Sequence, residues 1–276
     1  MTTETISLQD AADRLGVHYM TAYRYVRTGR LHAAKSGGQW HVHTADLDAF
    51  ADGTESEPTP RSEVYPERIE GRLMAGDETG AMQLLEDAMT AGASPDEAYI
   101  DLLGPALTSV GTRWAQGEIS IADEHVATAT AMRVISRLGP RLAKRGRSRG
   151  TVVLAGVSGD HHSLPTAMLR DLLRHRNFDV IDLGAHTPAT SVLDRATRIP
   201  DLVAVGLAAT QPGNDDVISD ALHHLDGALS VPVVLGGAAI RDDDHARSLG
   251  PCVPTHSTRD ALETFEELYE TASRAS

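Results

Sequence analysis

One short stretch restricts the fold of this chain more than any other. An apolar run at residues 151–157 (TVVLAGV) is followed by the polar loop 159–163 (GDHHS) and by a helical pattern over residues 164–175. A strand, a loop and a helix in this order predict a βα unit of an α/β domain with a parallel sheet. Such sheets bind ligands outside the carboxyl ends of their strands. We therefore expect the loop to lie at a binding edge.

The loop carries a carboxylate and an imidazole two residues apart, Asp160 and His162. An imidazole binds a metal through one ring nitrogen while a nearby carboxylate holds the other nitrogen and fixes the tautomer. Taken alone, the pair is explained equally well as a hydrogen-bonded polar loop, because a short motif is only a hypothesis.

Three further apolar runs follow, at residues 178–184 (FDVIDLG), 202–206 (LVAVG) and 231–237 (VPVVLGG). The order G-D-x-H-x-L, D-V-x-D-L-G and V-P-V-x-x-G-G resembles the cobalamin-binding domain of methionine synthase and its relatives. The resemblance covers residues 151–276. It implies that His162 is the lower axial ligand of cobalt and that the nucleotide tail of the cofactor runs toward a Gly-Gly turn. The cofactor-binding residues that it implies here are Asp160, His162, Ser163, Leu164, Gly206, Gly236 and Gly237.

Two positions depart from the pattern of that family. Pro165 stands where the family usually has Gly, and we place the end of the third strand at Gly206, where the family usually has Ser. Proline is compatible with the first turn of a helix, but the close backbone approach that glycine permits is lost. Both positions bear on how the nucleotide tail is held, and neither removes the ligand His162.

The composition excludes some classes of protein. The chain of 276 residues has one cysteine, Cys252, so no internal disulfide forms and a reducing cytoplasm fits. No signal peptide and no membrane span is expected, and we expect no enzyme. The net charge of −14 argues against DNA binding, but residues 1–50 hold five basic and five acidic residues, so the acidity lies elsewhere.

Residues 1–52 predict a small DNA-binding domain. Two short helices joined by residues 15–17 (LGV) are followed by a hairpin and a third helix. The pattern LGVxxxTxYRYVRTGRLxAxKxGGxWxV resembles the winged helix-turn-helix of the MerR/excisionase family. A winged helix that binds only proteins is the alternative, but the clustered basic residues favour DNA. The resemblance implies DNA contacts at Thr21, Tyr23, Arg24, Arg27 and Lys35, whereas Trp40 is expected to pack the wing.

A linker is predicted at residues 53–62, followed by four helices, at about residues 66–75, 79–90, 95–115 and 120–144. Short connections between them predict a bundle over residues 63–145, before the α/β domain at residues 150–276. Trp114 ends the third helix, and Glu124 and His125 begin the fourth. Without further information, these three would be a packed tryptophan and two exposed polar residues.

The spacing W-x9-E-H resembles that of cobalamin-dependent photoreceptor repressors of the CarH/LitR type, which share the same order of modules. The resemblance implies that Trp114, Ile121, Glu124 and His125 surround the 5′-deoxyadenosyl group of adenosylcobalamin. It departs at Ala115, where the best-known photoreceptors have a histidine that binds cobalt after illumination; His125 is the nearest replacement in the sequence. A bilin as a second chromophore is also left open.

The sequence thus predicts a multidomain protein with a winged helix-turn-helix, a four-helix bundle and a flavodoxin- or Rossmann-like cobalamin domain. We interpret it as a cytoplasmic, light-responsive repressor that binds operator DNA as a dimer or tetramer in the dark with adenosylcobalamin. Three alternatives stay open: a light-independent cobalamin sensor, a photoreceptor that holds cobalamin and a bilin, and a corrinoid carrier of a methyltransferase system.

Overall fold

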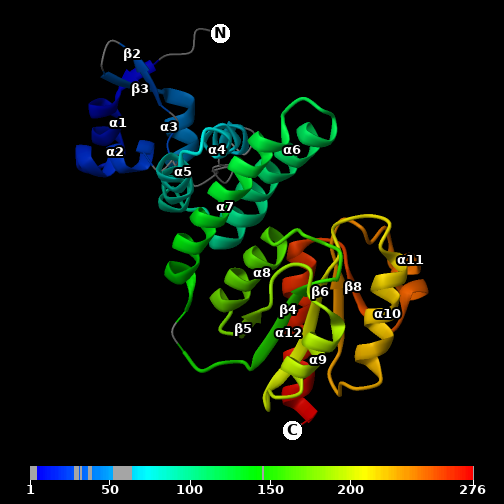
Figure 1. The fold of residues 1–276 in the computed structure, drawn as a ribbon. Coiled ribbons are helices and arrows are strands. Elements are labelled where there is room, and N and C mark those ends of the chain that lie inside the picture. Colours follow the sequence, from blue (N-terminus) through cyan, green and yellow to red (C-terminus); the bar gives the residue numbers. More distant parts are fainter. Residues whose placement is uncertain are drawn as a thin grey trace. The chain divides into compact units, whose positions relative to one another are not determined.

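The computed structural model describes residues 5–27, 31, 33–36, 39–51, 64–144 and 146–275. The chain divides into two compact units, one made of residues 1–71 and 79–108, the other of residues 72–78 and 109–276. The predicted fold class is confirmed, with a helix-turn-helix region, a helical region and a parallel α/β domain (Figure 1). The linker predicted at residues 53–62 lies outside the described residues.

The N-terminal region has three helices and a small antiparallel sheet of order β1-β3-β2. Its elements are β1 (Thr5–Ser7), α1 (Leu8–Arg14), α2 (Tyr19–Arg27), β2 (Ala34–Ser36), β3 (Gln39–His43) and α3 (Thr44–Ala51). Helix α1 is capped at its start, because the Ser7 hydroxyl accepts the N–H of Asp10 at 3.1 Å. Strand β1 was not predicted, since three residues are too few to show an alternating pattern.

A compact apolar core holds this region together. It consists of Leu8, Ala11, Ala12, Ala22, Leu31, Val42 and Leu47. Trp40 is partly buried against this core, which confirms that it supports the wing. Because Ala22 is fully buried, α2 turns that face inward and presents its opposite face to solvent.

The helical region contains α4 (Val64–Met74), α5 (Glu78–Thr90), the π-helical segment η1 (Glu97–Leu103), α6 (Gly104–Ala115) and α7 (Ile121–Leu142). The predicted third helix therefore begins with π-helical turns before it becomes α-helical. A capping box precedes it: the Ser94 N–H donates to the Glu97 carboxylate at 2.6 Å and the Glu97 N–H to the Ser94 hydroxyl at 3.2 Å. Ser120 and Asp123 form the same pair of bonds before α7.

Helix α7 packs closely on α8 (Leu164–His175) of the α/β domain. A Cβ atom added to Gly139 would lie 2.2 Å from Oδ2 of Asp171, so glycine is needed for this approach. At the end of α7, Nδ1 of His175 bonds to the Leu142 carbonyl at 2.7 Å. These contacts fix the position of α7 on the domain that carries the Asp160–His162 loop.

The α/β domain has a parallel five-stranded sheet of order β5-β4-β6-β7-β8. Beyond α8, its elements are β4 (Thr151–Gly156), β5 (Asp179–Asp182), α9 (Ala189–Ala196), β6 (Leu202–Ala208), α10 (Asp215–Asp226), β7 (Val233–Gly236), α11 (Asp243–Leu249), β8 (Val253–Thr255) and α12 (Thr258–Ala275). Strand β4 is buried along its whole length, as expected of a central strand. Strand β8 was not predicted, because it is short and contains a proline.

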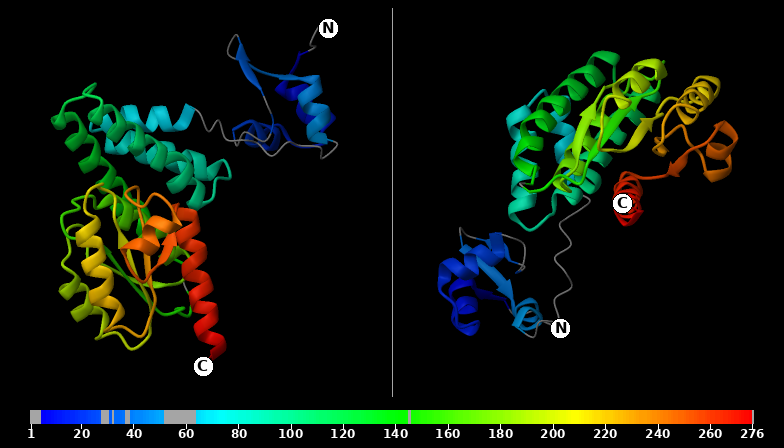
Figure 2. Two further views of the ribbon diagram at one scale, coloured as in Figure 1. Left: turned by 90° about the vertical axis from the view of Figure 1, so that its right-hand side faces the viewer. Right: turned by 90° about the horizontal axis from the view of Figure 1, so that it is seen from below.

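Helices cover both faces of the sheet (Figure 2). Helices α8 and α12 contact each other and the central strands, whereas α9, α10 and α11 form a second group of contacting helices. The loop after β4 leads to α8 and the loop after the adjacent strand β6 leads to α10, so the two loops diverge toward opposite faces. This divergence defines the switch point at which open α/β sheets bind ligands.

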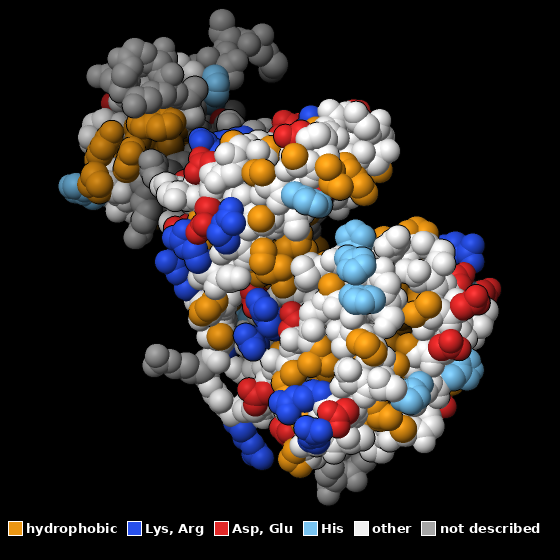
Figure 3. All heavy atoms as spheres, viewed as in Figure 1, with side chains coloured by type: hydrophobic (Ala, Val, Ile, Leu, Met, Phe, Trp, Pro, Cys, Tyr) orange, Lys and Arg blue, Asp and Glu red, His pale blue; other side chains and the backbone are white. Residues whose placement is uncertain are grey.

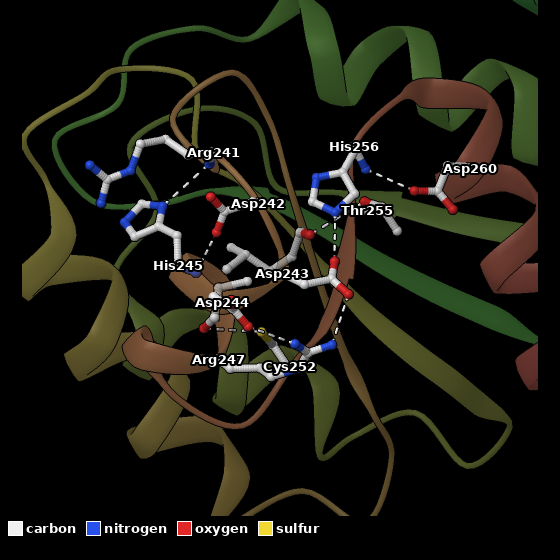
Figure 4. A network of polar contacts seen from close by, with 12 residues as sticks. Arg241, Asp242, Asp243, Asp244, His245, Arg247, Cys252, Thr255, His256 and Asp260 are labelled. Atoms are coloured by element: carbon white, nitrogen blue, oxygen red, sulfur yellow. Dashed lines mark hydrogen bonds and ion pairs between the residues drawn. The ribbon is translucent and has the colours of Figure 1, made fainter.

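Ion pairs hold the loop after β8, the strand at one end of the sheet (Figure 4). His256 follows β8; its Nε2 lies 2.7 Å from the Asp243 carboxylate, and its backbone N–H donates to Asp260 at 2.8 Å. The hydrogen bond from His256 holds the pKa of Asp243 below its ordinary value, with the charge of Arg247 acting in the same direction. The loop after β8 is thereby attached to both α11 and α12.

Within the part of the chain that the structure describes, no helix combines the length and the apolar character needed to cross a membrane.

Candidate functional site

The predicted Asp160–His162 pair lies at the switch point of the sheet. Nδ1 of His162 is 2.7 Å from Oδ1 of Asp160, and the same oxygen accepts the backbone N–H of His162 at 3.0 Å. The Asp160 side chain is 1% exposed and the His162 side chain 52% exposed. The carboxylate thus holds one ring nitrogen and leaves Nε2 directed to the open side, which is the arrangement required of a metal-binding imidazole.

Asp160 is held as a carboxylate by its surroundings. Burial alone would raise its pKa, but hydrogen bonds outweigh that effect and lower the pKa: first the backbone N–H of Thr210, then the N–H groups of His162 and Gln211 and the His162 ring. Thr210 and Gln211 both donate to Oδ2, the latter at 3.0 Å. An ionised Asp160 accepts a hydrogen bond from the Nδ1–H of His162, and in this tautomer Nε2 of His162 carries a free lone pair.

Two polar atoms beside this pair are buried and have no hydrogen-bond partner among the described residues. They are the Thr210 hydroxyl and the Asn214 amide nitrogen, both on the β6–α10 loop. Asn214 also borders the ligand loop, since a Cβ atom on Gly159 would lie 3.7 Å from its amide. Buried polar groups normally have hydrogen-bond partners, and exceptions mark places that a ligand or water completes. The donor set therefore fits a cofactor that presents amide groups at this edge, as a corrinoid does, and no spacing in the sequence pointed to these two residues.

The Gly-Gly turn lies at the end of β7, one strand further along the edge. Gly237 has a φ of +119°, and a Cβ atom there would lie 2.2 Å from the Ala209 carbonyl oxygen. A Cβ atom on Gly236 would lie 2.5 Å from the Thr255 hydroxyl. Gly237 is therefore required by the close approach of the Ala209 backbone, and Gly236 leaves room for the Thr255 side chain on the neighbouring strand β8. Their contacts with the cofactor remain a prediction.

The prediction that the third strand ends at Gly206 is wrong. Strand β6 continues to Ala208, so Gly206 lies inside the sheet between Leu154 and Val234. A Cβ atom on Gly206 would lie 2.6 Å from Cδ2 of Leu154 and 3.0 Å from Cζ of Phe265. The space beside Gly206 is filled by protein side chains, and the position at the open end of the strand is Ala208. The apolar run of residues 207–209 (LAA) gave no sign of this boundary in the sequence.

The start of α8 carries the remaining residues predicted from the loop. Ser163 is the N-cap, but its side chain makes no capping hydrogen bond, and Leu164 opens the helix half-buried. Pro165 lies in the first turn, as predicted, where its missing N–H costs nothing. The backbone path of the loop is therefore compatible with proline.

Glu124 and His125, the last two residues of the W-x9-E-H pattern, are hydrogen-bonded to each other. Oε2 of Glu124 lies 2.6 Å from Nδ1 of His125, and Oε1 accepts the Thr128 hydroxyl at 2.6 Å. Burial alone would raise the pKa of Glu124, but these hydrogen bonds and the charges of His125 and His162 together lower it. Glu124 is therefore held as a carboxylate at the start of α7.

Exposed apolar side chains occur where α6 ends and α7 begins. Trp114 in the last turn of α6 is 46% exposed, and Ile121 and Val126 in the first turns of α7 are 58% and 43% exposed. Several large apolar side chains exposed in one region indicate an interaction site. Figure 3 shows histidine side chains close together on this face of the molecule. Ala115, the residue after Trp114, is exposed as well.

Of the five predicted DNA contacts, the structure describes the side chains of two. Thr21 and Tyr23 are half-buried, and Tyr23 packs against the domain core. The side chains of Arg24, Arg27 and Lys35 lie outside the described residues, although their backbones belong to α2 and β2. The sequence interpretation missed Met20, which is 60% exposed, and Tyr19, which is 36% exposed and stacks on Tyr23.

Comparison with known families identifies the modules. Residues 5–54 match the helix-turn-helix domain family, and residues 66–138 and 150–266 match two B12 binding domain families. The helical segment and the α/β domain are thus both parts that bind B12 in related proteins.

Two similar proteins are transcriptional repressors of Myxococcus xanthus. The repressor CarH is 32% identical over 195 residues, which cover 68% of this chain and 62% of CarH. CarA is 30% identical over 193 residues, which cover 66% of this chain and 62% of CarA. The chain therefore matches less than two thirds of the length of either repressor. The predicted likeness to CarH-type proteins is confirmed.

Corrinoid proteins form a second group of relatives. Trimethylamine corrinoid protein 1 of Methanosarcina acetivorans is 29% identical over 177 residues, or 60% of this chain and 80% of that protein. Among solved structures, the monomethylamine corrinoid protein of Methanosarcina barkeri superimposes with a TM-score of 0.60 at 19% identity, over 75% of this chain and 98% of that protein. This structural likeness establishes the fold of the B12-binding part.

Proposed function

We propose that this chain, which belongs to the B12-binding proteins that carry a helix-turn-helix domain, is a transcriptional regulator whose assembly on DNA depends on adenosylcobalamin and light. The observation that carries the proposal is the group of exposed apolar side chains Trp114, Ile121 and Val126 where α6 ends and α7 begins, the region that also holds the bonded pair Glu124–His125. A corrinoid carrier would need the ligand His162 but neither this group nor a helix-turn-helix. The corrinoid relatives keep that alternative testable.

The residues have separable roles in the proposal. His162, oriented by Asp160, would bind the cobalt. Trp114 and Ile121 would exclude water from the adenosyl group, and Glu124 and His125 would provide polar contacts to it. When bound, adenosylcobalamin would supply a cobalt–carbon bond that light breaks. Trp114 and Ile121 would then cover apolar surface only while the adenosyl group is in place, so the stability of the start of α7 would depend on light.

Coupling to DNA follows from linkage. A ligand shifts an equilibrium between two states only by its difference in affinity for them, so the adenosyl form must bind the assembled state more tightly. Each chain carries one small DNA-binding domain, and linking several copies raises the affinity without any new contact. Disassembly therefore releases DNA while every residue of α2 stays unchanged.

The decisive experiment combines spectroscopy with size. The full chain, loaded with adenosylcobalamin in the dark, is expected to show a base-off, histidine-ligated spectrum and to elute as an oligomer. Green light should change the spectrum and reduce the size, with parallel loss of DNA in a mobility-shift assay. The same chain loaded with methylcobalamin, which lacks the adenosyl group, serves as the control. Light that changes the spectrum but neither size nor DNA binding would exclude the switch and favour a light-independent sensor, which the alanine at position 115 would suit.

Met20 gives the proposal a prediction about base recognition. It lies at the start of α2 on the face opposite the buried Ala22, and Arg24 and Arg27 follow four and seven residues later in the same helix. An exposed thioether suits contact with a thymine methyl group, which is worth about 0.8 kcal/mol, or roughly fourfold in affinity. Sites selected from random DNA should lose a thymine preference in Met20→Ala and keep it in Met20→Leu. Identical preferences in all three proteins would contradict this contact.

A further inference from the structure

His186 adopts a backbone conformation that demands an explanation. It lies in the loop between β5 and α9 and has a φ of +50°. Positive φ is uncommon outside glycine and persists where the surrounding contacts outweigh its cost. Among the described residues, the other non-glycine residue with a positive φ is Asn177, which follows the end of α8. His186 instead lies at the carboxyl edge of the sheet.

The conformation brings His186 into three contacts with the ligand loop. The N–H of Gly159 donates to Nδ1 of His186 at 2.7 Å, and the N–H of His186 donates to the Asp160 carbonyl at 2.8 Å. The rings of His186 and His161 pack with centroids 4.8 Å apart and planes inclined by 31°. His186 therefore binds the loop in three ways: its backbone N–H donates a hydrogen bond, its ring nitrogen Nδ1 accepts one, and its ring packs against His161.

These contacts complement those on the other side of the loop. Thr210 and Gln211 bind the side chain of Asp160, whereas His186 binds the main chain at Gly159 and Asp160. The segment before His162 is thus held on two sides. The β6–α10 loop binds the Asp160 side chain, and the β5–α9 loop binds the backbone of Gly159 and Asp160. Because Nδ1 of His186 accepts, its proton lies on Nε2 and the ring is neutral.

We propose that His186 is a positioning residue for the cobalt ligand: it holds the Gly159–Asp160 backbone so that Nε2 of His162 is presented at the sheet edge before the cofactor binds. The inference rests on the proposed role of His162 as lower ligand. Ligands held in place in advance bind metals more tightly, because the cost of ordering them is already met by the fold.

Three substitutions separate the hydrogen bond from the backbone conformation. His186→Gly relieves the positive φ but removes the acceptor and the ring; His186→Asn tolerates the same φ and offers a carbonyl oxygen as acceptor. His186→Ala has neither property. We expect the Gly and Ala variants to bind cobalamin about fivefold more weakly, as loss of one hydrogen bond predicts, with a larger base-on fraction in their spectra. His186→Asn should restore most of the histidine-ligated spectrum.

A second measurement uses the protein without cofactor. A hydrogen bond from the Gly159 amide to Nδ1 of His186 produces a scalar coupling between the two ¹⁵N nuclei, detectable by NMR in the uniformly labelled full chain. The coupling should be present in the wild type and in a His162→Ala chain, and absent in His186→Gly. Absence in the wild type, or wild-type affinity and spectrum in His186→Gly with thermal unfolding unchanged, would overturn the proposal. An unchanged cobalamin spectrum in His162→Ala would instead overturn the ligand assignment on which it rests.

Discussion

His162→Ala is expected to abolish the histidine-ligated spectrum of bound cobalamin and to weaken binding by at least about a hundredfold. Loss of an outer partner of a metal ligand already costs roughly ten- to a hundredfold, and here the ligand itself is lost. The side chain is 52% exposed and donates one bond, to a carboxylate that keeps three backbone donors. The substitution should therefore leave the fold intact while it removes the ligand. Absorption spectra and titration with hydroxocobalamin measure both effects.

The matched control is His224→Ala on α10, an exposed histidine away from the carboxyl edge. It removes one imidazole with the same change in composition and should bind cobalamin as the wild type does. A His162→Ala chain that kept the histidine-ligated spectrum would mean that another residue binds cobalt. The neighbouring His161 and His186 would then be the first residues to substitute.

The ligand pair could be predicted from the sequence because its two residues are local. Asp160 and His162 are two residues apart at the end of a strongly apolar strand, so the strand pattern and the spacing together place them. The residues that hold Asp160 come from the next loops of the sheet: Thr210 and Gln211 follow a strand fifty residues later. In a parallel sheet, neighbouring strands are separated by whole crossover helices. No sequence spacing therefore records which loop residues meet.

His186 illustrates the same limit from another side. Its sequence context, a Gly-Ala-His-Thr-Pro loop after an apolar strand, suggests only a turn. Its role depends on a positive φ and on two hydrogen bonds to residues 27 and 26 positions earlier, Gly159 and Asp160, and a residue pattern contains neither feature. The prediction that the strand ends at Gly206 was wrong for a different reason. Strand ends are set by pairing with neighbours, and the Ala-rich sequence after Gly206 looks the same inside and beyond the sheet.

Trp114→Ala is expected to leave cobalamin bound to His162 and to remove the preference for the adenosyl form. An exposed tryptophan gains by covering apolar surface: about half of a side chain that buries roughly 200 Å², at about 25 cal/mol per Å², is worth about 2.5 kcal/mol. Adenosylcobalamin should therefore bind roughly seventyfold more weakly, and hydroxocobalamin, which has no adenosyl group to cover, about as before. Dark assembly should fail with the adenosyl form, as measured on a sizing column.

The control for Trp114→Ala is Val217→Ala, which shortens an exposed apolar side chain on α10, outside the Trp114–Ile121–Val126 group. It should alter neither the ratio of the two cobalamin affinities nor the size of the dark oligomer. Equal losses for both cobalamins in Trp114→Ala would indicate that the residue supports the corrin or the fold rather than the upper group. Unchanged dark assembly would exclude it from the switch. In the proposed site His162 and Trp114 act on opposite sides of the cofactor, so only the first substitution should remove the ligand spectrum and only the second should separate adenosyl recognition from cobalamin binding.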